Sequence, residues 1–154
     1  MYQYTAIDEC TRFRFIAAFK EQSTYSSMRF LQQLIRRFPF KIHKVQTDNG
    51  AEFTKRFQAA DEANLTLFEK ELKRLGIAHQ KIRPYTPRHN GKVERSHRKD
   101  NEEFYATHTF YSFEDFKVQL ARRNRAYNNF PMRPLAWKSP REALSLFLAC
   151  VTYD

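Results

Sequence analysis

The sequence contains little glycine and almost no cysteine. Only three of its 154 residues are glycine, so Gly50, Gly76 and Gly91 each mark a place where the backbone geometry is demanding. The two cysteines, Cys10 and Cys150, lie near opposite ends of the chain and belong to no CxxC or cysteine–histidine pattern. This usage argues against a disulfide framework and against a structural zinc site.

The chain also lacks a long apolar run. No segment approaches the roughly 18 apolar residues that a membrane-spanning helix needs, and the amino terminus does not have the basic-then-apolar layout of a signal peptide. We therefore expect a cytoplasmic protein without a membrane partner.

Positive charge and aromatic residues, in contrast, are abundant. Lysine and arginine number 27 against 17 acidic residues, which gives a net charge of +10. A hydrophobic fraction of 42% with 15 phenylalanines can fill an ordinary core, so a disordered basic tail is excluded. A folded domain this basic is typical of proteins that bind a polyanion, and nucleic acid is the favoured one.

The hydrophobic pattern predicts an α/β domain in which a hairpin leads into a mixed sheet with helices on its faces. The predicted elements are strands at 2–7 and 14–19, a helix from Ser23 or Thr24 to Pro39, a strand at 42–47, a helix capped by Thr66 and Glu69, a strand at 77–83, and helices beginning near Lys92, Ser112 and Ser139. The first helix should bury the stripe Met28, Leu31, Ile35 and Phe38. We expect residues 1–108 to form the core and 109–154 its helical end with a basic tail.

Two acidic residues stand in unusual settings. Asp48 follows an apolar strand and precedes a turn at Asn49 and Gly50, which places its carboxylate at a sheet edge on a rigid element. Glu94 follows an Asn-Gly turn and is the only acid between Lys81 and Lys99, a span with seven lysines and arginines. Taken alone, Asp48 is equally explained as a turn residue, and Glu94 is better explained as a charge balancer. Together they suit phosphodiester chemistry, in which two Mg²⁺ ions roughly 4 Å apart are held by carboxylates.

Cationic and planar side chains near these acids are candidate DNA contacts. The predicted polar helix carries a cationic stripe suited to following phosphates, formed by Lys92, Arg95, Ser96 and Lys99. His97 lies on another side of this helix and is interpreted as a packing or hydrogen-bonding residue. Tyr85 could stack on a splayed base or pack on its neighbouring prolines, and the acid-free run from Lys117 to Arg141 could be a second contact or a solvated face. The predicted contacts are Asn49, Tyr85, Arg88, His89, Lys92, Arg95, Ser96, Lys99, Arg122, Arg123 and Arg125.

Three segments carry a family resemblance. The strings VQTDNGAEF, IRPYTPRHNGKVERSHR and YNNFPMRPLAWKSPREAL resemble the second and third acidic motifs and the end of the retroviral-type integrase core, as found in DDE transposases of bacterial insertion sequences. The resemblance implies a ribonuclease H-like fold, catalysis with Mg²⁺ or Mn²⁺, DNA nicking and strand transfer, and a multimer that bridges two element ends. It makes Asp48 the second metal-binding acid and Glu94 the third.

The first acid of this pattern has no match in the chain. The segment Asp8 to Arg12 resembles a later family pattern at the turn after the second strand, so Asp8 is assigned to turn chemistry. We therefore expect a first strand and its aspartate upstream of Met1, and a chain that is inactive by itself. The alternatives are a non-catalytic DNA-binding fragment that acts through mixed oligomers with full-length transposase, and a cellular nuclease of the same fold, which the basic tail disfavours.

Overall fold

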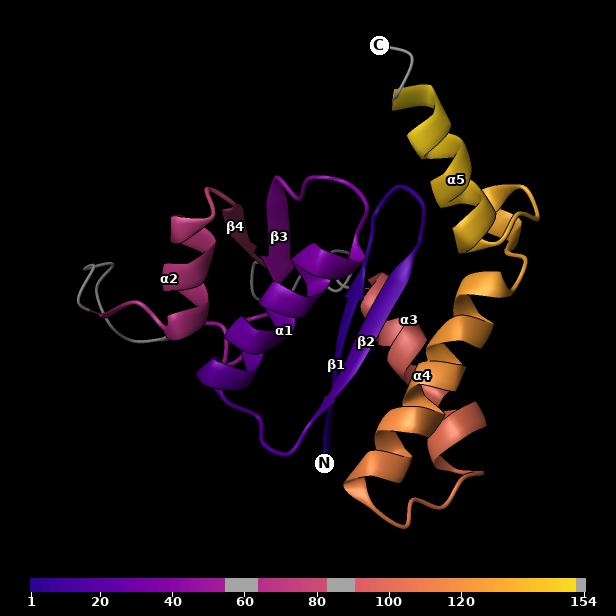
Figure 1. The fold of residues 1–154 in the computed structure, drawn as a ribbon, viewed down its shortest axis with the longest axis horizontal. Coiled ribbons are helices and arrows are strands. Elements are labelled where there is room, and N and C mark those ends of the chain that lie inside the picture. Colours follow the sequence, from indigo (N-terminus) through magenta and orange to yellow (C-terminus); the bar gives the residue numbers. More distant parts are fainter. Residues whose placement is uncertain (55–63, 83–90, 152–154) are drawn as a thin grey trace. The chain divides into compact units, whose positions relative to one another are not determined.

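The computed structural model describes residues 1–54, 64–82 and 91–151 (Figure 1). Strands and helices follow in the predicted order. They are β1 (Tyr2–Ile7), β2 (Arg14–Phe19), α1 (Thr24–Arg37), β3 (Lys44–Thr47), α2 (Leu67–Arg74), β4 (Ala78–Lys81), α3 (Gly91–Asp100), the π-helical turn η3 (Asn101–Tyr105), α4 (Phe113–Asn129), the 3₁₀ turn η4 (Arg133–Leu135) and α5 (Pro140–Val151). Among the described residues no helix is long and apolar enough to cross a membrane.

The chain divides into two compact units. Unit 1 consists of Met1, Gln3–Ala18 and Arg95–Asp154, and unit 2 of Tyr2 and Phe19–Glu94. Within the described residues the strands form two two-stranded sheets, β1 with β2 and β3 with β4.

The turn between β1 and β2 is built around Asp8. The backbone N–H of Asp8 donates to the carbonyl of Phe13 at 2.9 Å, and Arg12 takes a left-handed φ of 62°. Oδ2 of Asp8 accepts from both the N–H and the hydroxyl of Thr11, each at 2.7 Å. The predicted role of Asp8 in the turn is therefore confirmed.

Unit 1 has a core in which β2 meets helices from the second half of the chain. Ile16 of β2, Phe104 of η3, and Phe116 and Leu120 of α4 form one buried cluster. Burial of each such side chain contributes about 1.5–3 kcal/mol to the free energy of unfolding. The predicted helix from Lys92 to Tyr105 is present, but its last turn widens into η3, where the N–H of Ala106 donates to the carbonyl of Asn101.

In unit 2 the helix α1 begins as predicted but buries a different face. Ser23 is the N-cap and accepts from the N–H of Ser26, and the helix ends before Pro39. The residues buried within it are Ser26, Ser27, Phe30, Leu31 and Leu34. The predicted stripe is right at Leu31 and Phe38 and wrong at Met28 and Ile35, which are only half-buried. Serines at this interface are small, so that face can approach its neighbours closely, which hydrophobicity alone does not indicate.

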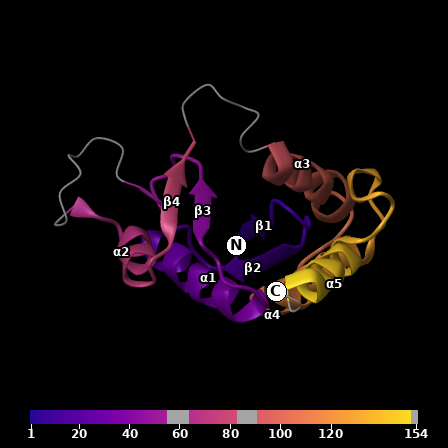
Figure 2. The same ribbon diagram turned by 90° about the horizontal axis from the view of Figure 1, so that it is seen from above.

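The helix α2 and the β3–β4 pair complete unit 2. Thr66 and Glu69 form the predicted capping box, and Gly76 closes the helix with a left-handed φ of 65°. The strands are parallel, with Thr47 opposite Lys81. Figure 2 shows α1 and α2 on the same side of this pair.

Candidate functional site

Asp48 lies in a tight turn at the carboxyl end of β3. Its Oδ1 accepts from the N–H of Gly50 at 3.0 Å, and the carbonyl of Gly50 then accepts from the N–H groups of Phe53 and Thr54. The side chain of Asp48 is nevertheless exposed. Asp48 is thus a turn residue, which was one of its two interpretations from the sequence. Its carboxylate also faces solvent, on a backbone that is held in place by hydrogen bonds.

Asn49 fixes this turn to the neighbouring strand. Its amide Nδ2 donates to the carbonyl of Ile82 at 2.9 Å, just beyond β4, and the N–H of Ile82 donates to the carbonyl of Thr47 at 3.0 Å. This bond gives the half-buried Asn49 a structural role beside Asp48. The predicted contact of Asn49 with DNA stays a prediction.

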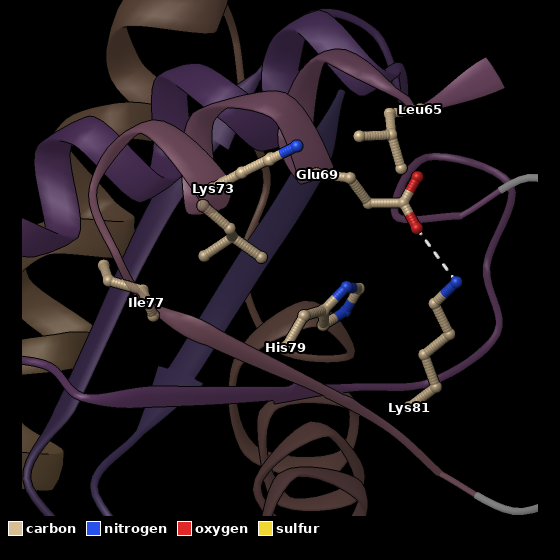
Figure 3. Close-up of a pocket in the computed structure, with 7 residues that line it drawn as sticks. Leu65, Glu69, Lys73, Ile77, His79 and Lys81 are labelled. Carbon is tan, nitrogen blue, oxygen red and sulfur yellow. Dashed lines mark ion pairs between the residues drawn. The ribbon is translucent and has the colours of Figure 1, made fainter. Parts of the chain in front are cut away.

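Polar side chains of α2 and β4 face each other beside the end of β3, all within unit 2 (Figure 3). Lys81 forms an ion pair with Glu69 at 2.9 Å and donates to the hydroxyl of Thr54. Nε2 of His79 lies 2.8 Å from the hydroxyl of Thr47, the residue before Asp48. Burial, and then the charge of Lys81, lower the pKa of His79, so the neutral ring is favoured here.

Glu69, His79 and Lys81 line an open hollow. Its lining residues are Leu65, Glu69, Leu72, Lys73, Ile77, His79 and Lys81. Burial opposes the charged form of Glu69, but bonds from Thr66 and Lys81 lower its pKa overall. Because Glu69 and Lys81 are paired with each other, we interpret this hollow as a support for the end of β3.

Glu94 lies on α3, and its direction is set by two residues that follow it. Ser96 and Asp100, one helical turn apart, are buried and both accept from Nη1 of Arg14 on β2, at 2.7 and 2.8 Å. Successive helical residues are rotated by about 100°, so Glu94 points away from the side on which Ser96 is buried. Glu94 and Arg95 are both exposed.

Ser96, one of the predicted DNA contacts, is buried in this structure. Its side chain is only 3% exposed, and its hydroxyl is bonded to the guanidinium of Arg14. The predicted stripe is interrupted there: Lys92 is half-buried, whereas Arg95 and Lys99 are exposed. Spacing placed Ser96 among cations, but a small hydroxyl is also suited to pairing with a buried guanidinium. His97, interpreted from the sequence as a packing or hydrogen-bonding residue, is exposed.

Arg123, another predicted DNA contact, is paired with acidic side chains. Its Nε donates to Asp100 at 2.9 Å and its Nη2 to Glu103 at 2.8 Å, and only 18% of its side chain is exposed. Its guanidinium belongs to the buried network and not to a solvent face. Arg122 and Arg125, on the same helix, are exposed as predicted.

The network of Arg14, Asp100 and Arg123 was missed from the sequence. Burial opposes ionisation of Asp100, but the charge of Arg14 and bonds from Gln3, Arg123 and Arg14 lower its pKa overall. One signal was present in the sequence: Arg14 is the lone charge in the apolar strand FRFIAAF, and a buried charge requires a partner.

The remaining predicted residues stay untested. Tyr85, Arg88 and His89 lie outside the described residues. Within the described ranges no group of three or more His, Cys, Asp or Glu residues could hold a metal ion. The metal-binding roles of Asp48 and Glu94 remain predictions.

Comparisons with known proteins place these motifs in a family. One integrase core domain model matches residues 1–87 and a second matches residues 75–140. The retrovirus-related Pol polyprotein from transposon TNT 1-94 of Nicotiana tabacum is 32% identical over 99 residues, which is 63% of this chain and 7% of that protein. The chain thus spans a small part of this curated relative.

A solved structure shows the same fold. The catalytic core domain of BIV integrase matches with a TM-score of 0.70 and 21% identity, over 99% of this chain and 90% of that one. The fold is therefore the ribonuclease H-like α/β fold of an integrase catalytic core. Because one family model alone covers more than half of the residues, the chain belongs to the integrase core domain family.

Proposed function

We propose that this chain is the core of a transposase of the bacterial insertion-sequence type, which cuts DNA at element ends and joins them to target DNA. The observation that carries the proposal is the exposed carboxylate of Asp48, which lies in a family motif at the end of a parallel strand pair. The carboxylate accepts from Gly50, and the next residue, Asn49, fixes the turn to Ile82. DNA is the proposed substrate, and a homo-oligomer or mixed oligomer the proposed assembly.

The proposed reaction has two displacements at phosphorus. Water attacks the phosphodiester at the element end, and the bond to the 3′ oxygen breaks to leave a free 3′-hydroxyl. That hydroxyl then attacks a phosphodiester of the target, forming a new ester and releasing a 3′-hydroxyl from the target strand. The proposed role of Asp48 and Glu94 is to hold the reacting groups in place, because correct placement of these groups supplies much of the rate.

The donor set fits a hard divalent cation in its chemistry. Asp48 and Glu94 both offer exposed carboxylate oxygens, the ligands that Mg²⁺ and Mn²⁺ prefer. When bound, such an ion activates the attacking oxygen and neutralises charge that develops on the leaving oxygen. Two carboxylates are a weak site by themselves.

Asp8 is not proposed as a third ligand. Its Oδ2 already accepts two short bonds from Thr11, and these hold the hairpin turn. We therefore propose that the 154-residue chain by itself binds metal weakly and joins DNA ends slowly or not at all.

The test combines metal binding with DNA joining on the purified chain. Mn²⁺ binding, followed by water proton relaxation, should be weak in the wild type and lost in Asp48→Asn and in Glu94→Gln. Asp8→Asn should leave Mn²⁺ binding unchanged, which makes it the matched carboxylate control. Any Mg²⁺-dependent nicking of an end substrate should depend on Asp48 and Glu94 in the same way.

Two results would contradict the proposal. Robust strand transfer that Asp8→Asn abolishes would return Asp8 to the site. Unchanged Mn²⁺ binding in both Asp48→Asn and Glu94→Gln would favour the non-catalytic DNA-binding alternative.

A further inference from the structure

Figure 1 shows the loop between α4 and α5. This loop carries an aromatic residue that the proposed chemistry does not use. Trp137 is the only tryptophan of the protein, and 70% of it is exposed. We call residues 130–138 the Trp137 loop. An exposed aromatic side chain of this size does not gain the hydrophobic free energy of burial in the fold, so we looked for a binding partner that would cover it.

The backbone holds Trp137 in an unusual conformation. Ala136 and Trp137 have left-handed φ angles of 51° and 64°, which residues with a Cβ rarely adopt. The N–H of Trp137 donates to the carbonyl of Met132 at 3.0 Å, and the N–H of Met132 donates to the carbonyl of Lys138 at 3.0 Å. The indole is therefore carried on a loop with internal hydrogen bonds.

The surroundings of Trp137 are cationic. Arg133 and Lys138 within the loop are exposed, and the sequence has no acidic residue from Lys117 to Arg141. The next acid, Glu142, accepts from the N–H and the hydroxyl of Ser139 at the start of α5. Nζ of Lys99 lies 5.5 Å from the ring centre of Phe130, which is itself 60% exposed. The loop thus combines planar rings with positive charge.

Another exposed aromatic residue of unit 1 has the opposite surroundings. Tyr111 is 88% exposed, but it lies just before the acidic residues Glu114 and Asp115 and its N–H donates to Asp115. Exposure of an aromatic ring is therefore shared by both positions, whereas exposed cations without an acid in the same loop belong to Trp137. This contrast provides an internal control.

We propose that the Trp137 loop binds an unpaired base at a DNA end, with the indole stacked on the base and Arg133 and Lys138 against the adjoining phosphates. Aromatic rings with nearby cations recognise single-stranded nucleic acid in this way, because every unpaired base offers a free face. Bases within a duplex are already stacked on each other. The inference rests on the proposed function in taking DNA ends as the ligand.

The experiment uses the single tryptophan as its own reporter. The full 154-residue chain, without divalent metal, is titrated with a duplex carrying an unpaired 3′ extension and with a blunt duplex of the same sequence. The indole emission should be quenched strongly by the first and weakly by the second. Trp137→Ala should weaken binding of the extended duplex at least about fivefold by anisotropy, while leaving the blunt duplex within about twofold.

Two further variants separate stacking from folding. Tyr111→Ala should bind both duplexes like the wild type. Trp137→Phe, which retains a stacking ring, should recover most of the affinity for the extended duplex. Thermal unfolding of each variant checks that the fold is retained.

Each remaining outcome counts against the inference. Unchanged emission at saturation, or equal losses for both duplexes in Trp137→Ala, would overturn it. Emission that depends on protein concentration without DNA would assign the loop to a second copy of the chain instead. If no DNA binds at all, the proposed function fails as well, whereas binding without an indole response removes only this inference.

Discussion

Arg14 shows how a single residue can organise unit 1. Its side chain is fully buried and lies 4.1 Å from the ring centre of Tyr127. The side chain of Asn128 accepts from the backbone N–H of Arg14 at 2.9 Å and donates to the backbone carbonyl of Arg14 at 2.7 Å. The same residue thus joins β2 to α3 through its guanidinium and to α4 through its backbone.

The first prediction concerns Asp100, the buried partner of Arg14. Asp100→Asn removes the charge that three donors, from Gln3, Arg14 and Arg123, now share. A buried guanidinium without its counter-charge should lower the free energy of unfolding by about 3–5 kcal/mol. Urea unfolding measures this change.

A surface ion pair of the same unit is the control. Lys117 and Glu114 are 2.6 Å apart but both largely exposed, so Glu114→Gln should cost less than about 1 kcal/mol. A comparable loss in both variants would show that burial is not what makes the Asp100 pair important.

At the scale of elements, Glu71 connects the two helices of unit 2. It lies on α2 and is largely buried, and it accepts from Gln32 of α1 at 3.1 Å and from Arg74 at 2.8 Å. The bonds from Arg74, partly opposed by burial and aided by Gln32, lower its pKa from 4.5 to about 2. The charged carboxylate is thus stabilised by the folded state.

The pH dependence of stability follows from this sign. Because the folded state lowers the pKa of Glu71, its contribution is complete above the unfolded pKa near 4.5 and disappears as the pH falls toward about 2. Glu71→Gln should therefore lower the free energy of unfolding by about 1 kcal/mol at pH 7, and by little at pH 2. Unfolding midpoints across this range test it.

Exposed Glu21 provides a comparison for that experiment, since Glu21→Gln should give nearly the wild-type curve at every pH. An equal deficit of Glu71→Gln at pH 2 and pH 7 would contradict the assignment to the Arg74 and Gln32 bonds.

Element boundaries were largely predictable from local chemistry. The capping box of Thr66 and Glu69 is present, and Ser139 with Glu142 forms reciprocal bonds at the start of α5. Such signals act within three residues, so no other part of the chain is needed to interpret them. The buried face of α1 was predicted only in part, because several adjacent stripes of that helix carry apolar side chains.

For the whole molecule, the net charge of +10 predicts strongly salt-dependent DNA binding. Of the predicted DNA contacts on α4, Arg122 and Arg125 are exposed, which makes them candidate phosphate-binding residues. Replacing both with glutamine should reduce the slope of log affinity against log salt by about 0.9 for each phosphate of duplex DNA that the variant no longer neutralises. Fluorescence anisotropy at several salt concentrations gives this slope.

A matched pair removes the same charge elsewhere. Arg36 and Arg37 are exposed at the end of α1. They lie outside the two basic segments, 81–99 and 117–141. Their double replacement should leave the slope nearly unchanged. Equal slopes for the two double variants would mean that net charge, and not the α4 surface, sets the affinity.

The sequence by itself determined the order of the elements, the hairpin turn at Asp8, the capping boxes and the turn that carries Asp48, because these depend on residues only a few positions apart. Tertiary structure decided which polar side chains are buried. Ser96 and Arg123 were assigned to a DNA surface and instead bond to Arg14 and Asp100, and Arg14 is 86 residues from Asp100 along the chain. Local periodicity says that a residue is polar, but only the packed partner decides whether its polar atoms face water or another charge.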